Sequence, residues 1–180
     1  MIVKYNNTEY NIPNYLNQIE ERVDLMSLPL EVWLEYFTRL TGQGDVVFMK
    51  KVLKYQIMKQ DSKVNVFSFR GKDYWWDKNT RIGLDRLANS GKNFYEIVLG
   101  TEIVEVSKEQ LQNLLNQLEI YANKCFVNTQ RHLNAIEALN TPLELIEYNY
   151  TLGYPDKIVI EWIHPFLLRF RQVFVMMTNL

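Results

Sequence analysis

The stretch that decides the fold is Ser107–Asn140, "SKEQLQNLLNQLEIYANKCFVNTQRHLNAIEALN", because it carries the strongest periodic signal in the chain. Apolar or small side chains recur there every three or four positions, which is the spacing of one face of an α-helix. They are Leu111, Leu115, Leu118, Ala122, Cys125, Thr129, Leu133, Ile136 and Leu139. Ser107 with Gln110 has the form of a capping box at the start. The stretch therefore predicts one long helix with a buried stripe.

Shorter elements flank this helix. Upstream, the patterns predict a first hairpin, a helix from the N-cap Asp77 to Gly91, and a second hairpin around Gly100. The strands read "VNVFSF" and "DYWW" in the first hairpin, and "NFYEIVL" and "EIVEV" in the second. Downstream, Thr141, Pro142 and Glu144 start a short helix by the same cap logic. The predicted order is β-β-α-β-β-α-α.

The N-terminal part predicts a separate small unit. Its first residues alternate around Asn6, which indicates a β-hairpin of Ile2–Tyr5 with Glu9–Ile12. Helical patterns follow in "PNYLNQIEERVDLM", in "PLEVWLEYFTRLTG", and from Asp45 to about Gln60. The fold class is thus expected to be α+β. The expected divisions are a hairpin and helical unit at 1–60, an α+β domain at 61–156, and an apolar C-terminal arm or interface segment at 157–180.

Composition narrows the classes of protein. The chain has 180 residues, enough for one domain or for a domain with a small companion. Its 20 basic and 21 acidic residues nearly cancel, so no specific nucleic-acid binding is expected. The cluster Lys50, Lys51, Lys54 and Lys59 is interpreted as a solvated helix face. A single cysteine and the lack of a secretory signal favour a reducing cytoplasm.

The sequence predicts a protein without catalytic, metal or cofactor sites. One Cys and two His are too few for a structural zinc site. Cys125 and His132 are two helical turns apart, about 10 Å along the axis, which is too far for direct proton transfer. Glycine-rich phosphate loops and a nucleophile elbow are absent. Glu102 and Glu105 are explained by the solubility of a hairpin strand.

Two apolar segments are the candidate interfaces. The first is the tail from Ile158, "IVIEWIHPFLLRFRQVFVMMTNL", in which Glu161, Arg169 and Arg171 leave no stretch of about 20 apolar residues, so no membrane span is expected. As a helix or as an extended arm it is apolar on more than one side, which favours a second chain as its partner; packing within its own domain is the alternative. The second is an aromatic cluster in the first hairpin. The candidates are Trp162, Phe166, Leu167, Phe170, Arg171, Phe174 and Met177 of the tail, and Tyr74, Trp75 and Trp76.

A resemblance adds a biological context. The runs "VFSFRGKDYWWDKNTRIGLDRL" and "NAIEALNTPLELIEY", with Gly71, Lys72, Asp77 and the turn at Gly100, resemble an uncharacterised domain family of phage and prophage tail-region genes. The resemblance covers about residues 64–155. It rests on turns, caps and core positions, and it brings no catalytic residues.

The resemblance implies a bacteriophage virion component or assembly factor. The expected function is a non-enzymatic virion structural protein of the tail or the portal-tail neck, which forms a homo-oligomeric ring or contacts other tail, neck or portal proteins. It would be located in the virion, and in the host cytoplasm during assembly. The first alternative is a tail or tail-fibre assembly chaperone that is absent from the mature virion. The second is a host-directed protein that binds through Tyr74, Trp75 and Trp76.

Overall fold

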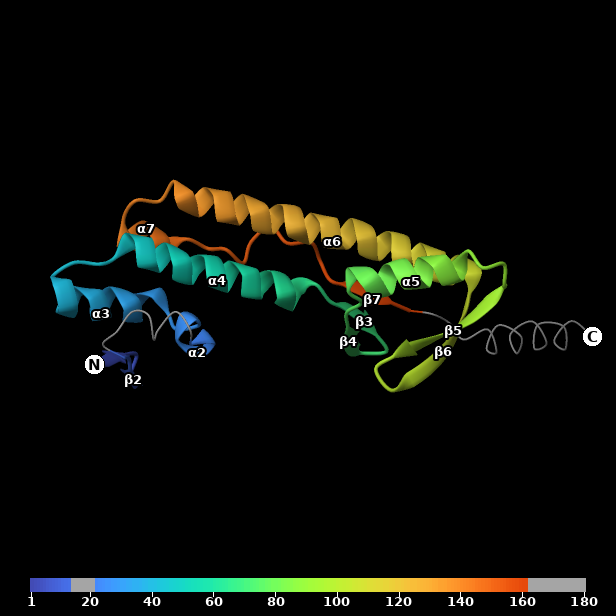
Figure 1. Ribbon diagram of the computed structural model, residues 1–180, viewed down its shortest axis with the longest axis horizontal. Coiled ribbons are helices and arrows are strands. Elements are labelled where there is room, and N and C mark those ends of the chain that lie inside the picture. Colours follow the sequence, from blue (N-terminus) through green and yellow to red (C-terminus); the bar gives the residue numbers. More distant parts are fainter. Residues whose placement is uncertain (14–21, 162–180) are drawn as a thin grey trace, which may run out of the picture. The chain divides into compact units, whose positions relative to one another are not determined.

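The computed structural model describes residues 1–13 and 22–161, and its fold is α+β (Figure 1). The strands are β1 (Ile2–Tyr5), β2 (Thr8–Asn11), β3 (Phe67–Phe69), β4 (Lys72–Tyr74), β5 (Phe94–Leu99), β6 (Glu102–Ser107) and β7 (Ile158–Ile160). The helices are α2 (Val23–Met26), α3 (Leu30–Thr41), α4 (Val46–Val64), α5 (Lys78–Ala88), α6 (Lys108–Glu137) and α7 (Pro142–Glu147). The predicted long helix is α6, and the predicted order of elements from β3 to α7 is confirmed.

The chain forms two compact units that do not follow the predicted divisions. Among the described residues, unit 1 contains those of Met1–Asn65 and Glu119–Asp156, and unit 2 contains Val66–Leu118 and residues 157–161. The prediction placed a boundary between residues 60 and 61, but this position lies inside α4. The long helix α6 contributes its first part to unit 2 and the rest to unit 1, so sequence order and packing do not coincide.

Unit 1 joins the N-terminal hairpin and helices to the second part of α6. Asn6 and Asn7 both have positive φ, 47° and 61°, which is the geometry of a two-residue hairpin turn. Aromatic rings fill the core, where Trp33 lies 4.9 Å from Phe48 between ring centroids. At the far end of α4, Thr129 of α6 donates a hydrogen bond of 2.7 Å to Asp61.

Caps fix the ends of these helices as the sequence predicts. The Asp45 side chain accepts a hydrogen bond from the backbone N–H of Phe48 and begins α4. Thr141 and Glu144 form a complete capping box on α7. The lysines of the predicted solvated face also have a structural role: Lys50 donates to the carbonyl of Glu137 at 2.7 Å, and Lys54 pairs with its carboxylate.

Unit 2 contains a three-stranded sheet of order β4-β3-β7 and a separate two-stranded sheet of β5 and β6. β3 pairs antiparallel with β4 and parallel with β7. Because β7 lies in the segment predicted as an arm at 157–180, the first residues of that segment are a strand of the chain's own sheet. The predicted strand "DYWW" is also shorter, since β4 ends at Tyr74.

The core of unit 2 contains the inner face of the β5–β6 hairpin and the start of α6, together with Phe67, Phe69, Trp76, Ala88 and Ile160. Five residues from the inner face of the hairpin are buried with four leucines of α6. These are Tyr95, Ile97, Leu99, Val104 and Val106, with Leu111, Leu114, Leu115 and Leu118. The predicted capping box is present, because Ser107 N–H donates to the Gln110 side chain and Gln110 N–H donates to the Ser107 hydroxyl. The core therefore holds one face of the hairpin, and the opposite face is outside it.

Candidate functional site

The outer face of the β5–β6 hairpin is the best candidate for a functional site. We define the hairpin outer face as Phe94, Glu96 and Val98 of β5 with Ile103 and Glu105 of β6. Side chains alternate along a strand, so these residues face away from the buried set. The apolar ones are exposed by 53% at Phe94, 62% at Val98 and 70% at Ile103. Exposed apolar side chains gathered on one face are typical of a protein-binding surface.

On this face, the register of the two strands sets apolar side chains opposite each other and acidic side chains opposite each other. Val98 lies opposite Ile103, and Glu96 lies opposite Glu105. The turn at Gly100, where φ is +62°, sets this register with only one further residue between the strands. Two carboxylates directly across a strand pair repel each other. The hairpin outer face is therefore an apolar surface that carries a local negative charge.

Among the described residues, neither Glu96 nor Glu105 has a hydrogen-bond or ion-pair partner for its carboxylate. Glu102 of the same hairpin is different, because Lys72 lies 2.9 Å from its carboxylate and Arg70 lies 3.6 Å from it. The Lys72 ammonium lowers the pKa of Glu102 below its usual value through a hydrogen bond and charge attraction. The negative charges of Glu96 and Glu105 are therefore available to a cationic group of a binding partner.

The main chain of the hairpin adds a second binding feature. Within the described part of the chain, β5 and β6 pair only with each other, so each strand has one edge without a strand neighbour. Free strand edges carry unpaired N–H and C=O groups, to which another chain can add a strand. An apolar face beside open edges suits a polypeptide partner better than a small molecule.

The structure places the predicted aromatic cluster mainly in the core. Trp76 is buried, with its ring centroid 5.2 Å from that of Phe67. Tyr74 is half-buried and lies 6.0 Å from the same ring. Trp75 is half-buried, with the Arg81 guanidinium 5.0 Å from its ring centroid. These rings are packed against their own unit, while the predicted tail residues from Trp162 onward lie outside the described residues.

The imidazole of His132 and the thiol of Cys125, the two side chains best suited to acid–base or nucleophilic chemistry, make contacts inside unit 1. His132 Nε2 lies 2.9 Å from the Leu152 carbonyl and 3.1 Å from Asn128 Nδ2. Its Nδ1 lies 2.6 Å from the Tyr148 hydroxyl. Burial raises the pKa of the Cys125 thiol and keeps it protonated. These contacts attach the loop after α7 to α6, and they leave neither group poised for catalysis.

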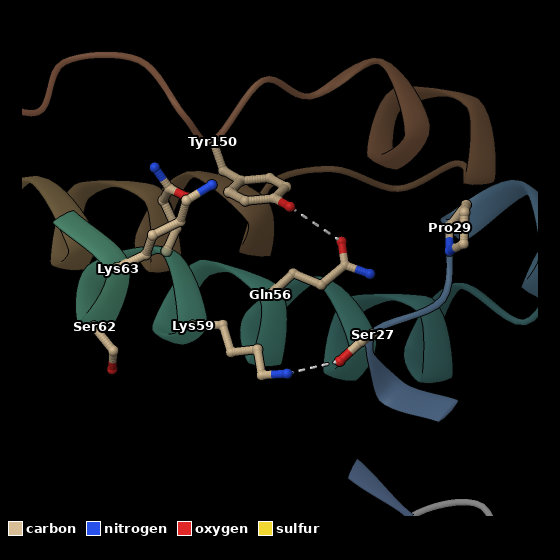
Figure 2. Close-up of a pocket in the computed structure, with 8 residues that line it drawn as sticks. Ser27, Pro29, Gln56, Lys59, Ser62, Lys63 and Tyr150 are labelled. Atoms are coloured by element: carbon tan, nitrogen blue, oxygen red, sulfur yellow. Dashed lines mark hydrogen bonds between the residues drawn. The ribbon is translucent and has the colours of Figure 1, made fainter. Parts of the chain in front are cut away.

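A cleft of about 690 Å³ also lies in unit 1, along α4 (Figure 2). Figure 2 shows that hydrogen bonds join its walls: Lys59 donates to the Ser27 hydroxyl at 3.0 Å, and Tyr150 donates to Gln56 at 3.5 Å. Among the described residues that line it, the charged ones are Lys59 and Lys63, and none is a carboxylate or an imidazole. The described lining therefore shows no pair of an acid and a base of the kind that hydrolysis or proton transfer uses.

No group of three or more His, Cys, Asp and Glu side chains in the described part could hold a metal ion. None of the helices described here has the length and apolar character to cross a bilayer.

The sequence reading missed the hairpin outer face, although the signal was present. In "FYEIVL" and "EIVEV" the positions that alternate with the core residues include Phe94, Val98 and Ile103, which are apolar as well. A hairpin with one solvated face normally has polar residues at those positions. The sequence analysis considered Glu105 together with Glu102 of the same strand, whereas the strand register places Glu105 opposite Glu96.

Comparison with known proteins gives no relative. No family model, no curated protein and no solved structure matches the chain.

Proposed function

We propose that the protein is a non-enzymatic structural protein of a bacteriophage virion, in the tail or the portal-tail neck, which assembles as a ring or with other tail proteins. The phage context is supported by the sequence resemblance over residues 64–155. The assembly role is supported by the hairpin outer face.

The hairpin outer face is the single observation that carries the assembly role. Phe94, Val98 and Ile103 are more than half exposed, and each contributes roughly 1–2 kcal/mol when a partner removes its exposed part from water. They lie together on a hairpin whose other face is fixed in a core, so the surface is presented on a rigid support. Binding to a rigid surface loses little conformational entropy, which favours a stable assembly.

A ring requires that one surface of each subunit bind a different surface of its neighbour. The hairpin outer face supplies one of these two surfaces. The apolar residues predicted in the tail, among them Phe166, Phe170 and Phe174, are candidates for the other. An assembly chaperone would use the same surfaces transiently, and it would leave before the particle is complete.

Mass spectrometry of purified virions tests the proposal. The protein is expected in mature particles at a copy number comparable with that of other tail or neck proteins. If it is found in infected cells during assembly but is missing from particles purified to constant composition, the structural role is overturned in favour of the chaperone. Particles treated with high salt before analysis serve as the control for loosely adsorbed protein.

A further inference from the structure

The composition of the hairpin outer face defines what can cover it. Phe94 at one end and the Val98–Ile103 pair at the other flank the opposed carboxylates of Glu96 and Glu105. Covering the apolar residues alone would also take the two carboxylates out of water. Burying unpaired charges costs several kcal/mol per ion. A partner must therefore bring cations into the middle of an apolar contact.

The C-terminal sequence of this chain has that composition. Residues 162–180 contain two arginines, Arg169 and Arg171, and no Asp or Glu. Phenylalanines and aliphatic residues lie on both sides of the arginine pair, among them Phe166, Phe170 and Phe174. Arginine forms two parallel hydrogen bonds with a carboxylate, and it is better suited than lysine to contacts removed from water. The segment thus matches the hairpin outer face in charge and in apolar character.

We infer that the C-terminal segment, residues 162–180, of a second copy of this chain docks on the hairpin outer face, with Arg169 and Arg171 against Glu96 and Glu105. The inference rests on the proposed function for its choice of a second copy rather than the same chain. Docking between copies joins unlike surfaces, which is the contact that a ring repeats. A segment of this length spans roughly 60 Å when extended, which is enough to reach a neighbouring subunit.

Charge reversal on each side of the contact tests this inference in the full-length protein. The face variant is Glu96→Arg with Glu105→Arg, and the tail variant is Arg169→Glu with Arg171→Glu. Each variant alone sets like charges against each other and is expected to weaken self-association by at least about 100-fold, as two charge-assisted contacts are lost. Molar mass is measured by size-exclusion chromatography with light scattering over a range of concentrations.

The mixed and combined variants identify the partner. In an equimolar mixture each variant repels its own kind, but both contacts between a face variant and a tail variant pair opposite charges, so the mixture is expected to regain assembly with the two variants alternating. The fourfold variant, which carries all four reversals, is expected to regain the wild-type assembly. Glu147→Arg, a reversal of another exposed carboxylate on α7, serves as the matched control and is expected to assemble as the wild type does.

Two outcomes overturn the inference. In the first, the wild type stays monomeric at every concentration and the fourfold variant regains thermal stability that the double variants lose; the segment then docks on its own chain. In the second, the double variants assemble as the wild type does. Circular dichroism checks that each variant is folded. A second face variant, Glu96→Gln with Glu105→Gln, removes the charge without reversing it and is expected to weaken association by only about tenfold.

The two proposals fail separately. If the protein assembles in solution as described but is missing from virions, the docking stands and the structural role in the particle does not. If the protein is present in virions but the double variants assemble normally, the role stands and this contact does not.

Discussion

Gly153 shows how a single residue fixes the loop that lies over α6. Its φ of +79° is a conformation that side chains disfavour, and a Cβ there would lie 2.7 Å from Asn128 Oδ1. Asn128 in turn donates to the Leu152 carbonyl at 2.9 Å, so it has little freedom to move. The loop therefore packs on α6 in this way only because residue 153 has a hydrogen atom where other residues have a Cβ.

Replacing Gly153 with alanine is expected to destabilise the protein by about 2–4 kcal/mol, as backbone strain and a steric clash add together. Urea unfolding followed by circular dichroism measures the change. Gly42→Ala is the matched control, because Gly42 also has positive φ, +85°, but no atom lies within 4 Å of its added Cβ. It is expected to lose only about 1 kcal/mol. Equal losses for the two variants would contradict the proposed clash with Asn128.

Tyr121 gives a prediction about alkaline pH. Its hydroxyl donates to the Val64 carbonyl at 2.7 Å, and burial raises its pKa to about 12. The unfolded pKa is about 10, so the folded state holds this proton more tightly. The resulting stability is fully present below pH 10, and it is lost as pH rises towards 12.

Tyr121→Phe is expected to lose about 1 kcal/mol at pH 7, because the Val64 carbonyl loses its donor. From pH 10 to 12 its stability should then fall less steeply than that of the wild type. Chemical unfolding at a series of pH values measures both effects. A parallel decline of the two proteins above pH 10 would show that Tyr121 is not responsible for the alkaline loss.

At the level of elements, local signals in the sequence were sufficient for most of the fold. Caps at Asp45, Asp77 and Thr141 act within three residues, and the stripe of α6 repeats within one helical turn, so both can be read from neighbouring positions. β7 was missed because its partner β3 lies about ninety positions earlier in the chain. Three apolar residues in front of an apolar tail carry no local sign of a parallel strand.

Ile160 and Val159 test β7 with adjacent residues on opposite faces of the strand. Ile160 is 9% exposed and belongs to the core of unit 2, whereas Val159 is 64% exposed. Ile160→Ala is expected to cost about 2–4 kcal/mol, and Val159→Ala less than about 0.5 kcal/mol. Urea unfolding measures both. A reversed order would mean that the strand presents its other face to the core.

The candidate site could be predicted only in part for the same reason. Apolar residues at alternate positions on both faces of the β5–β6 hairpin were readable, but which face α6 covers depends on the packing of residues such as Leu111 and Leu118. The pairing of Glu96 with Glu105 depends on register, which the turn at Gly100 sets. The cluster of Tyr74, Trp75 and Trp76 was a candidate interface, and the three-dimensional packing buries Trp76 and half-buries the other two rings against the core of unit 2.

At the scale of the whole molecule, the division into units could not be read from sequence order. α6 belongs to both units, and the chain enters unit 2 at Val66 and returns to it at Lys157. Linker-like composition marks boundaries only between units that are continuous in sequence, and each of these units contains segments far apart in the chain. The α+β class was nevertheless correct, because it depends only on which elements are present.

We propose that the hairpin outer face joins the protein to a virion. The most direct measurement is the copy number of a Val98→Asp, Ile103→Asp variant in purified virions, determined by quantitative mass spectrometry after infection of cells in which this variant replaces the wild type. Val47→Asp is the control, because Val47 is also an exposed apolar residue but lies on α4 in unit 1.

Wild-type and Val47→Asp proteins are expected in the particle at comparable copy number. The hairpin variant is expected to be folded and present in the cell but depleted from particles by at least about tenfold, since charges placed in the contact must be desolvated. Undiminished incorporation of the folded hairpin variant, or absence of the wild-type protein from particles, would contradict the claim.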